Sequence, residues 1–107
     1  ILIRTGWSSL WGKDNARYGA RSPGIGVAAA EWLAKRRPML VGADNPSVEV
    51  SPNPDPNVNL PVHQVMLVVH GIHLIENLRL DELGAQAVYE FAFLVQPLKM
   101  QGGTGST

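Results

Sequence analysis

The clearest change of hydrophobic pattern along the chain lies between residues 60 and 78. Apolar residues first recur at the spacing of a helix that buries one face, and they are Val62, Val65, Met66 and Val69. After Gly71 the apolar positions alternate with polar ones, which is typical of a strand. The pattern predicts a helix that starts at Pro61, ends at Gly71 and leads directly into a strand.

Within this segment, His63 and Glu76 are the polar residues that suggest chemistry. In the helical phase His63 lies on the stripe beside the predicted buried face, and in the strand phase Glu76 shares a side with aliphatic residues. These neighbours are Ile72, Leu74 and Leu78. Because an unpaired carboxylate is costly to bury, Glu76 is expected to have a proton, hydrogen-bond donors or a metal ion as its partner.

The rest of the chain alternates patterns typical of strands and helices. Strands are predicted at residues 1–5, 39–43 and 88–95, and helices at residues 26–37 and 79–86. The core side of the first of these helices is expected to comprise Ile25, Ala28, Ala29, Trp32 and Leu33. This order of elements indicates an α/β fold in one domain over residues 1–107, with a mixed, partly parallel sheet and flanking helices.

Two segments lack a regular period and supply candidates for a ligand cleft. Residues 6–23 are predicted to form a loop, in which the aromatic residues Trp7, Trp11 and Tyr18 either line a cleft or cover an end of the sheet. Residues 51–59 contain alternating prolines and are predicted to be extended or turning. Asp44 follows a buried apolar run, where it either faces a cleft at the carboxyl end of the strand or caps the next turn.

A glycine pattern near residue 24 is similar to a nucleotide-binding motif but lacks its context. Gly24, Gly26 and Ala29 satisfy the spacing G-x-G-x-x-A, and Asp44 follows about 20 residues later. That motif requires a strand running directly into the first glycine, so that the pyrophosphate meets the helix N-terminus. Residues 14–23 do not have the pattern of a strand, so no nucleotide is expected here.

Composition restricts the classes of partner and ligand. Nine basic and nine acidic residues balance, which argues against a nucleic-acid or anionic-membrane partner. With no cysteine in the chain, His, Asp and Glu are the strong metal ligands that remain. His73 is expected to face away from Glu76, and neither His70 nor His73 is a good third ligand. The apolar runs are shorter than the roughly 20 residues of a membrane helix. The chain is therefore expected to be soluble and cytoplasmic.

Five strings of residues, taken together, carry a family resemblance. They are ILIRTGW, PGIGVAAAEWLA, LVGADNPSVE, PVHQVMLVVHGIHLIENLRLDEL and VYEFAFLVQPLKMQGGTGS. In this order they resemble the carboxyl-terminal half of the cyclase-like metal-dependent hydrolases, a family that includes bacterial kynurenine formamidase, an enzyme of tryptophan catabolism. The resemblance implies part of a swivelling β/β/α fold. The start at Ile1, in mid-strand, also suggests a piece of a longer domain.

The resemblance also implies an activity and a set of site residues. It implies hydrolysis of an amide or lactam C–N bond in a small-molecule substrate, with a divalent Zn or Mn ion that polarises the carbonyl and acidifies water. His63 and Glu76 match the positions of two metal ligands of the family. The residues that match or adjoin its substrate cleft are Asp44, Trp7, Trp11, Gly103 and Thr104.

One part of the family pattern is missing from this sequence. The histidine-rich string H-x-G-T-H-x-D-x-P-x-H, which carries further ligands and the proposed general base, does not occur in residues 1–107. No catalytic residue is therefore assigned within the chain. Two interpretations stay open: a portion of a hydrolase that needs the missing segment, and a non-catalytic α/β module whose sheet edge and apolar surface are covered by self-association. A homo-oligomer is expected.

Overall fold

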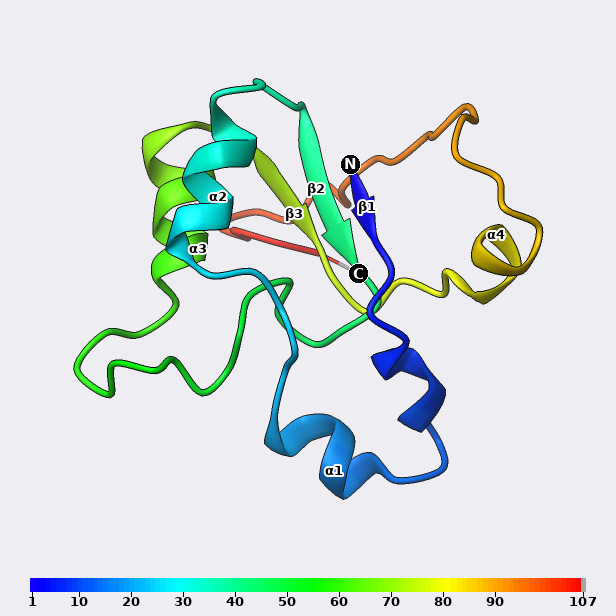
Figure 1. Cartoon of the computed structure of the whole chain (residues 1–107). Helices are drawn as coiled ribbons and strands as arrows, with labels where there is room; N and C mark the ends of the chain where they lie inside the picture. Colours follow the sequence, from blue (N-terminus) through cyan, green and yellow to red (C-terminus); the bar gives the residue numbers. More distant parts are fainter. Residues whose placement is uncertain (107) are drawn as a thin grey trace.

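The apolar run Leu40–Ala43 forms β2, the middle strand of a three-stranded sheet. In this computed structural model, which describes residues 1–106, β1 (Leu2–Ile3) and β3 (His73–Ile75) pair with β2 on its two sides (Figure 1). Both pairings are parallel. All four residues of β2 are buried, which is typical of strands in parallel sheets. The predicted α/β class is therefore confirmed.

Two helices pack together beside the sheet and enclose the core. The first is α2 (Val27–Ala34), and the second consists of α3 (Pro61–His63) followed without a break by η2 (Gln64–Val69) (Figure 1). Both helices bury small or aliphatic side chains against β2. The buried core comprises Ala30, Leu33, Ala34, Val41, Ala43, Val48, Val62, Met66 and Ile72.

The η2 segment is a π-helix, and its wider turn changes which residues face the core. The backbone N–H of His70 donates to the carbonyl of Val65, five residues earlier, at 3.1 Å. Val62 and Met66 are fully buried as predicted, whereas Val69 is 70% exposed. The prediction for Val69 was wrong because it assumed the 3.6-residue turn of an α-helix throughout.

The α2 helix turns a different face to the core than the sequence pattern predicted. Ala30, Leu33 and Ala34 are buried, while Trp32 is 55% exposed. The Arg36 guanidinium lies 3.2 Å from the centre of the Trp32 ring, so the indole is covered by a cation instead of the core. The prediction that Trp32 faces the core was therefore wrong.

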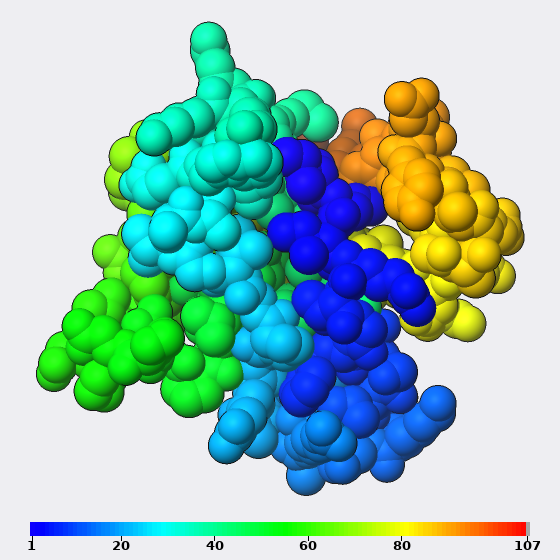
Figure 2. Space-filling view, in the orientation of Figure 1, coloured from blue at the N-terminus to red at the C-terminus, as the bar shows by residue number. Residues whose placement is uncertain are grey.

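The amino-terminal segment is more regular than the predicted loop. It contains η1 (Trp7–Leu10) and α1 (Asn15–Ala20), and the Asp14 carboxylate caps α1 by accepting the N–H of Arg17 at 3.0 Å. The proline-rich residues 51–59 are extended or turning as predicted and form the green projection in Figure 2. The predicted helical turn near residue 80 is α4 (Asp81–Ala85).

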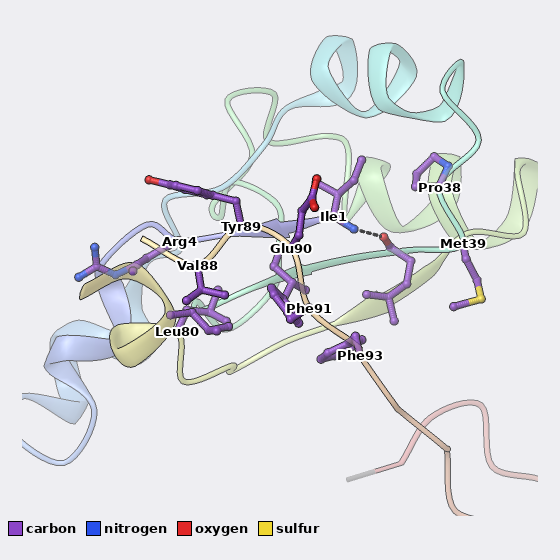
Figure 3. A pocket seen from close by; sticks show the side chains of 14 residues that line it. Ile1, Arg4, Pro38, Met39, Leu80, Val88, Tyr89, Glu90, Phe91 and Phe93 are labelled. Carbon is purple, nitrogen blue, oxygen red and sulfur yellow. Dashed lines mark hydrogen bonds between the residues drawn. The ribbon is translucent and has the colours of Figure 1, made fainter. Parts of the chain in front are cut away.

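The expected strand at residues 88–95 does not form, although the structure describes all of these residues. They run beside β1 without joining the sheet, so the sheet is parallel and not mixed as predicted. A groove of about 660 Å³ lies between β1, α4 and this segment, and most of its lining is apolar (Figure 3). None of the helices in residues 1–106 has the length and apolar character needed to cross a membrane.

Candidate metal centre

His63 stands in the first turn of α3, at a helix start held by Glu49. The Glu49 carboxylate accepts the N–H of Val62 at 3.0 Å and the N–H of His63 at 3.2 Å. These N–H groups have no partner inside the helix, and a carboxylate also complements the positive end of the helix dipole. Glu49 is fully buried, so its side chain is confined to this position.

The same carboxylate contacts the His63 ring. Glu49 Oε1 lies 2.5 Å from His63 Nδ1, on the side of the imidazole that faces the protein interior. His63 Nε2 then points the other way and lies 3.2 Å from Glu76 Oε1. The three side chains thus lie in a row in which the imidazole stands between two carboxylates, and the partly exposed Glu76 is at the outer end of this row.

The distance between His63 Nε2 and Glu76 Oε1 fits two donors on one metal ion. Zn²⁺ binds nitrogen and oxygen at about 2.0–2.2 Å in tetrahedral geometry, so two such ligands lie about 3.3 Å apart. The observed separation is 3.2 Å. The carboxylate behind Nδ1 also fits, because metal-ligating histidines commonly donate their second N–H to a carboxylate.

Two donors are only part of a metal site. Among residues 1–106, no group of three or more His, Cys, Asp or Glu side chains is arranged to hold a metal ion. His70 lies instead 3.8 Å from Glu31, and His73 is an exposed residue of β3. The residues present therefore fit half of a metal centre, to which further donors would have to be added.

Burial raises the pKa of Glu76 above its usual value, and the charge of Glu49 adds to the rise. The charge and hydrogen bond of His63 lower this pKa and offset part of the effect. A carboxylate in such surroundings is stabilised by a nearby positive charge. Perturbed carboxylates of this kind concentrate at functional sites, which agrees with the position of Glu76.

Asp44 is buried at the carboxyl end of β2, and hydrogen bonds occupy both of its oxygens. Oδ1 accepts from the N–H and hydroxyl of Thr5 at 2.7 and 2.6 Å, and Oδ2 accepts from the N–H of Gly6 at 2.9 Å and the hydroxyl of Ser8 at 3.2 Å. Burial alone would raise the pKa of Asp44, but these hydrogen bonds outweigh it and hold the pKa below its usual value. Asp44 therefore ties the carboxyl end of β2 to the turn that leads from β1 into η1.

Tyr18 joins the two tryptophans of the amino-terminal segment to the candidate centre. Trp7 Nε1 donates to the Tyr18 carbonyl at 3.2 Å, and the rings of Trp11 and Tyr18 meet edge to face at 5.1 Å. The Tyr18 hydroxyl donates to Asn77 Oδ1 at 2.7 Å, beside Glu76. Burial raises the pKa of Tyr18, and the charges of Asp44 and Glu76 raise it further. Both tryptophans thus lie near the end of the sheet that carries Glu76.

The carboxyl-terminal candidates form a local turn. The N–H of Gly103 donates to the carbonyl of Met100 at 3.1 Å, and Thr104 follows this turn. The N–H of Leu98 donates to the Ser106 hydroxyl at 3.0 Å, which closes the segment on itself. The role of Gly103 and Thr104 beside a substrate cleft stays a prediction.

Glu49 is the residue that the sequence analysis missed. Its neighbours Val48 and Val50 are apolar, so it resembles Glu76 as a carboxylate among aliphatic side chains. The reasoning that identified Glu76 applies equally to Glu49, because neither can be buried without donors.

Comparison with known proteins finds a family model and a curated protein that this chain resembles. Residues 1–50 match the family model described as "Putative cyclase". Over 106 residues the chain is 38% identical to a protein named kynurenine formamidase from Polaromonas naphthalenivorans (strain CJ2), covering 99% of this chain and 41% of that protein. No solved structure matches. The chain thus spans less than half the length of this relative, and the resemblance to the cyclase family that was predicted from the sequence is confirmed.

Proposed function

We propose that this chain supplies one half of the metal centre of a cyclase-family hydrolase that cleaves amide or lactam C–N bonds. The observation that carries the proposal is the 3.2 Å approach of His63 Nε2 to Glu76 Oε1, with Glu49 behind the imidazole. The relative named kynurenine formamidase supports the hydrolase class and a formamide as the kind of substrate. A swivelling β/β/α fold for the whole protein belongs to the same proposal.

In this proposal, His63 and Glu76 are ligands, and each brings a different property. As a metal ligand the imidazole would be a neutral nitrogen donor, held in place by a buried carboxylate, whereas Glu76 would bring a negative charge from the partly exposed end of β3. A divalent Zn or Mn ion would supply Lewis-acid chemistry, polarising the substrate carbonyl and acidifying water. Trp7 and Trp11, gathered around Tyr18, would provide an apolar wall for an aromatic substrate near this end of the sheet.

The remaining donors would come from polypeptide outside residues 1–107. A catalytic zinc site has three protein ligands and an open position, whereas two are present here. Since the relative from Polaromonas is more than twice as long as the matched region, it has room for a second set of ligands. Metal affinity of the 107-residue chain alone is therefore expected to be weak.

The proposal is tested by titrating the chain with Zn²⁺ and Mn²⁺ in a calorimeter. Binding is expected to be weak in the parent and lost in His63→Ala and Glu76→Ala. It should be retained in His73→Ala and Glu82→Ala, which remove an exposed imidazole and an exposed carboxylate. Hydrolysis of an aryl formamide is then measured with a longer polypeptide that adds a histidine-rich segment. Equal binding by all four variants, or no metal-dependent hydrolysis by the longer protein, would reject the proposed centre.

The apolar groove beside β1 favours a second function, that of an association module. Phe91 and Phe93 lie edge to face at 6.3 Å and are each at least 40% exposed (Figure 3). Within residues 1–106, the outer edge of β1 has no strand partner. Unpaired edges and apolar patches are normally covered in stable proteins. Self-association would cover them in a homo-oligomer. Light scattering distinguishes this function: a stable oligomer that binds no metal would favour it over the hydrolase.

A further inference from the structure

We infer that Glu49 is a positioning residue that fixes the tautomer and direction of His63, so that its Nε2 lone pair faces Glu76. The purpose of this role of Glu49 rests on the proposed function, but its effect on the His63 tautomer can be measured in the protein without any metal. Glu49 belongs neither to the predicted ligands nor to the predicted cleft. The role is assigned to it by its contacts alone.

The hydrogen-bond capacity of the two side chains determines the tautomer. Ionised carboxylate oxygens accept hydrogen bonds and cannot donate them, so the ring nitrogen that contacts Glu49 has to carry a hydrogen. That nitrogen is Nδ1. In a neutral imidazole the other nitrogen, Nε2, then has no hydrogen and presents its lone pair. The bare side of His63 is therefore the side that faces Glu76.

Glu76, on the other side of the His63 ring, shows what this tautomer requires. Glu76 Oε1 lies 3.2 Å from His63 Nε2, so in the neutral tautomer a lone pair on nitrogen meets an acceptor oxygen. Two acceptors at hydrogen-bonding distance repel each other unless a proton or a cation lies between them. Glu49 thus holds His63 in the orientation in which its Nε2 and the Glu76 carboxylate can bind one cation between them. Two ligands of one metal ion meet this same requirement.

The backbone at Glu49 packs closely against the segment that contains Gly24, and this close contact explains why residue 24 is a glycine. Ile25 and Glu49 form a parallel bridge, and the N–H of Ile25 donates to the Val48 carbonyl at 3.1 Å. A Cβ on Gly24 would lie only 2.2 Å from that carbonyl oxygen, whereas a Cβ on Gly26 would meet nothing within 4 Å. Gly24 is therefore needed for the packing that holds Glu49, and Gly26 is not.

The decisive experiment is long-range ¹H–¹⁵N NMR of the histidine rings in the ¹⁵N-labelled 107-residue chain without metal. Spectra are recorded over a series of pH values, and the tautomer is determined from those in which His63 gives the signals of a neutral ring. His63 is expected to show the pattern of a single tautomer protonated on Nδ1. The exposed His73 serves as an internal reference in the same spectrum. A neutral His63 ring protonated on Nε2 and not on Nδ1 would overturn the role of Glu49.

Variants then connect the tautomer to Glu49. In Glu49→Gln the amide must turn its NH₂ toward either the ring or a helix N–H, so population of the Nε2-protonated tautomer of His63 is expected. Glu31→Gln, next to His70, removes the same charge and should leave His63 unchanged. Gly24→Ala should alter the His63 tautomer without touching the ring, while Gly26→Ala should not. Retention of the parent pattern in both Glu49→Gln and Gly24→Ala would contradict the inference.

Metal titration of the same variants separates this inference from the proposed function. Loss of an outer carboxylate partner commonly lowers metal affinity about 10–100-fold. If the parent binds Zn²⁺, Glu49→Gln should weaken binding by that factor, and an unchanged affinity would refute the role of Glu49 at the metal. If the parent has the Nδ1 tautomer but binds no metal, the proposed function fails while the positioning of His63 by Glu49 stands.

Discussion

Replacing Asp44 by asparagine should destabilise the fold although the two side chains have the same shape. Each oxygen of Asp44 accepts one backbone N–H and one hydroxyl. In the asparagine, the NH₂ group takes the place of one oxygen and faces the N–H of either Thr5 or Gly6. The hydroxyl on that side can rotate and accept, but the backbone N–H cannot.

The expected cost follows from this one unpaired donor and from the lost charge. An unsatisfied buried donor costs about 1–3 kcal/mol, and a hydrogen bond to a charged group contributes about 1.5–3 kcal/mol. Because Thr5 and Gly6 are not fully buried, water relieves part of the penalty. We therefore expect Asp44→Asn to lower the free energy of unfolding by about 2–4 kcal/mol. Urea unfolding followed by tryptophan fluorescence measures this difference.

The same difference should depend on pH in a defined direction. The pKa of Asp44 is lowered in the folded protein from an ordinary value of 3.8. Its stabilising effect is therefore complete above the ordinary value and is lost as the pH falls through the lower, folded value. The gap in stability between the parent and Asp44→Asn should be constant from neutral pH to about pH 5 and shrink below pH 4.

The matched control is Glu90→Gln, which removes one negative charge from an exposed position. It should change stability by less than about 0.5 kcal/mol, as surface substitutions usually do. If Asp44→Asn proves as stable as this control at neutral pH, the hydrogen bonds of Asp44 do not stabilise the fold. A gap that stays constant into strong acid would refute the lowered pKa.

Three further outcomes test the core, the sheet and the metal centre. Met66→Ala empties a fully buried site and should cost about 2–5 kcal/mol in urea unfolding, whereas Val68→Ala, at an 81% exposed position, should cost almost nothing. Gly42→Ala would place a Cβ against the side chains of Ile75, Leu2 and Leu78 and should cost about 1–3 kcal/mol by the same measurement. Zn²⁺ at about 100 times its dissociation constant should stabilise the parent by about 2.7 kcal/mol in thermal unfolding, and an equal gain in His63→Ala would contradict ligation by this residue.

The sequence predicted those elements whose local pattern and tertiary packing agree. The run Leu40–Ala43 has no polar residue that would have to face water, which is typical of a buried strand. The glycine at position 71 has φ 64° and ends its helix as predicted. The approach of His63 to Glu76 was also predictable, because a helix and the strand that directly follows it pack against each other.

The errors occurred where tertiary contacts override the local pattern. Residues 88–95 alternate like a strand, but alternation cannot supply the partner that a strand needs for its hydrogen bonds. Val69 was assigned to the core because nothing in the apolar pattern marks a π-helix. The short helices of residues 7–20 depend on local capping by side chains such as Asp14, which gives no sustained period.

The π-helix of η2 has a consequence for recognising similar sites in other sequences. His63 is anchored at one end of this helical segment by Glu49, and Glu76 is anchored at the other end by β3, so their meeting point is fixed in space. The wide turn accommodates one residue more than an α-helix would between the same two anchors. Homologous chains with a regular helix here should place the two side chains twelve positions apart instead of the thirteen found here, and a search that demands one fixed interval would overlook them.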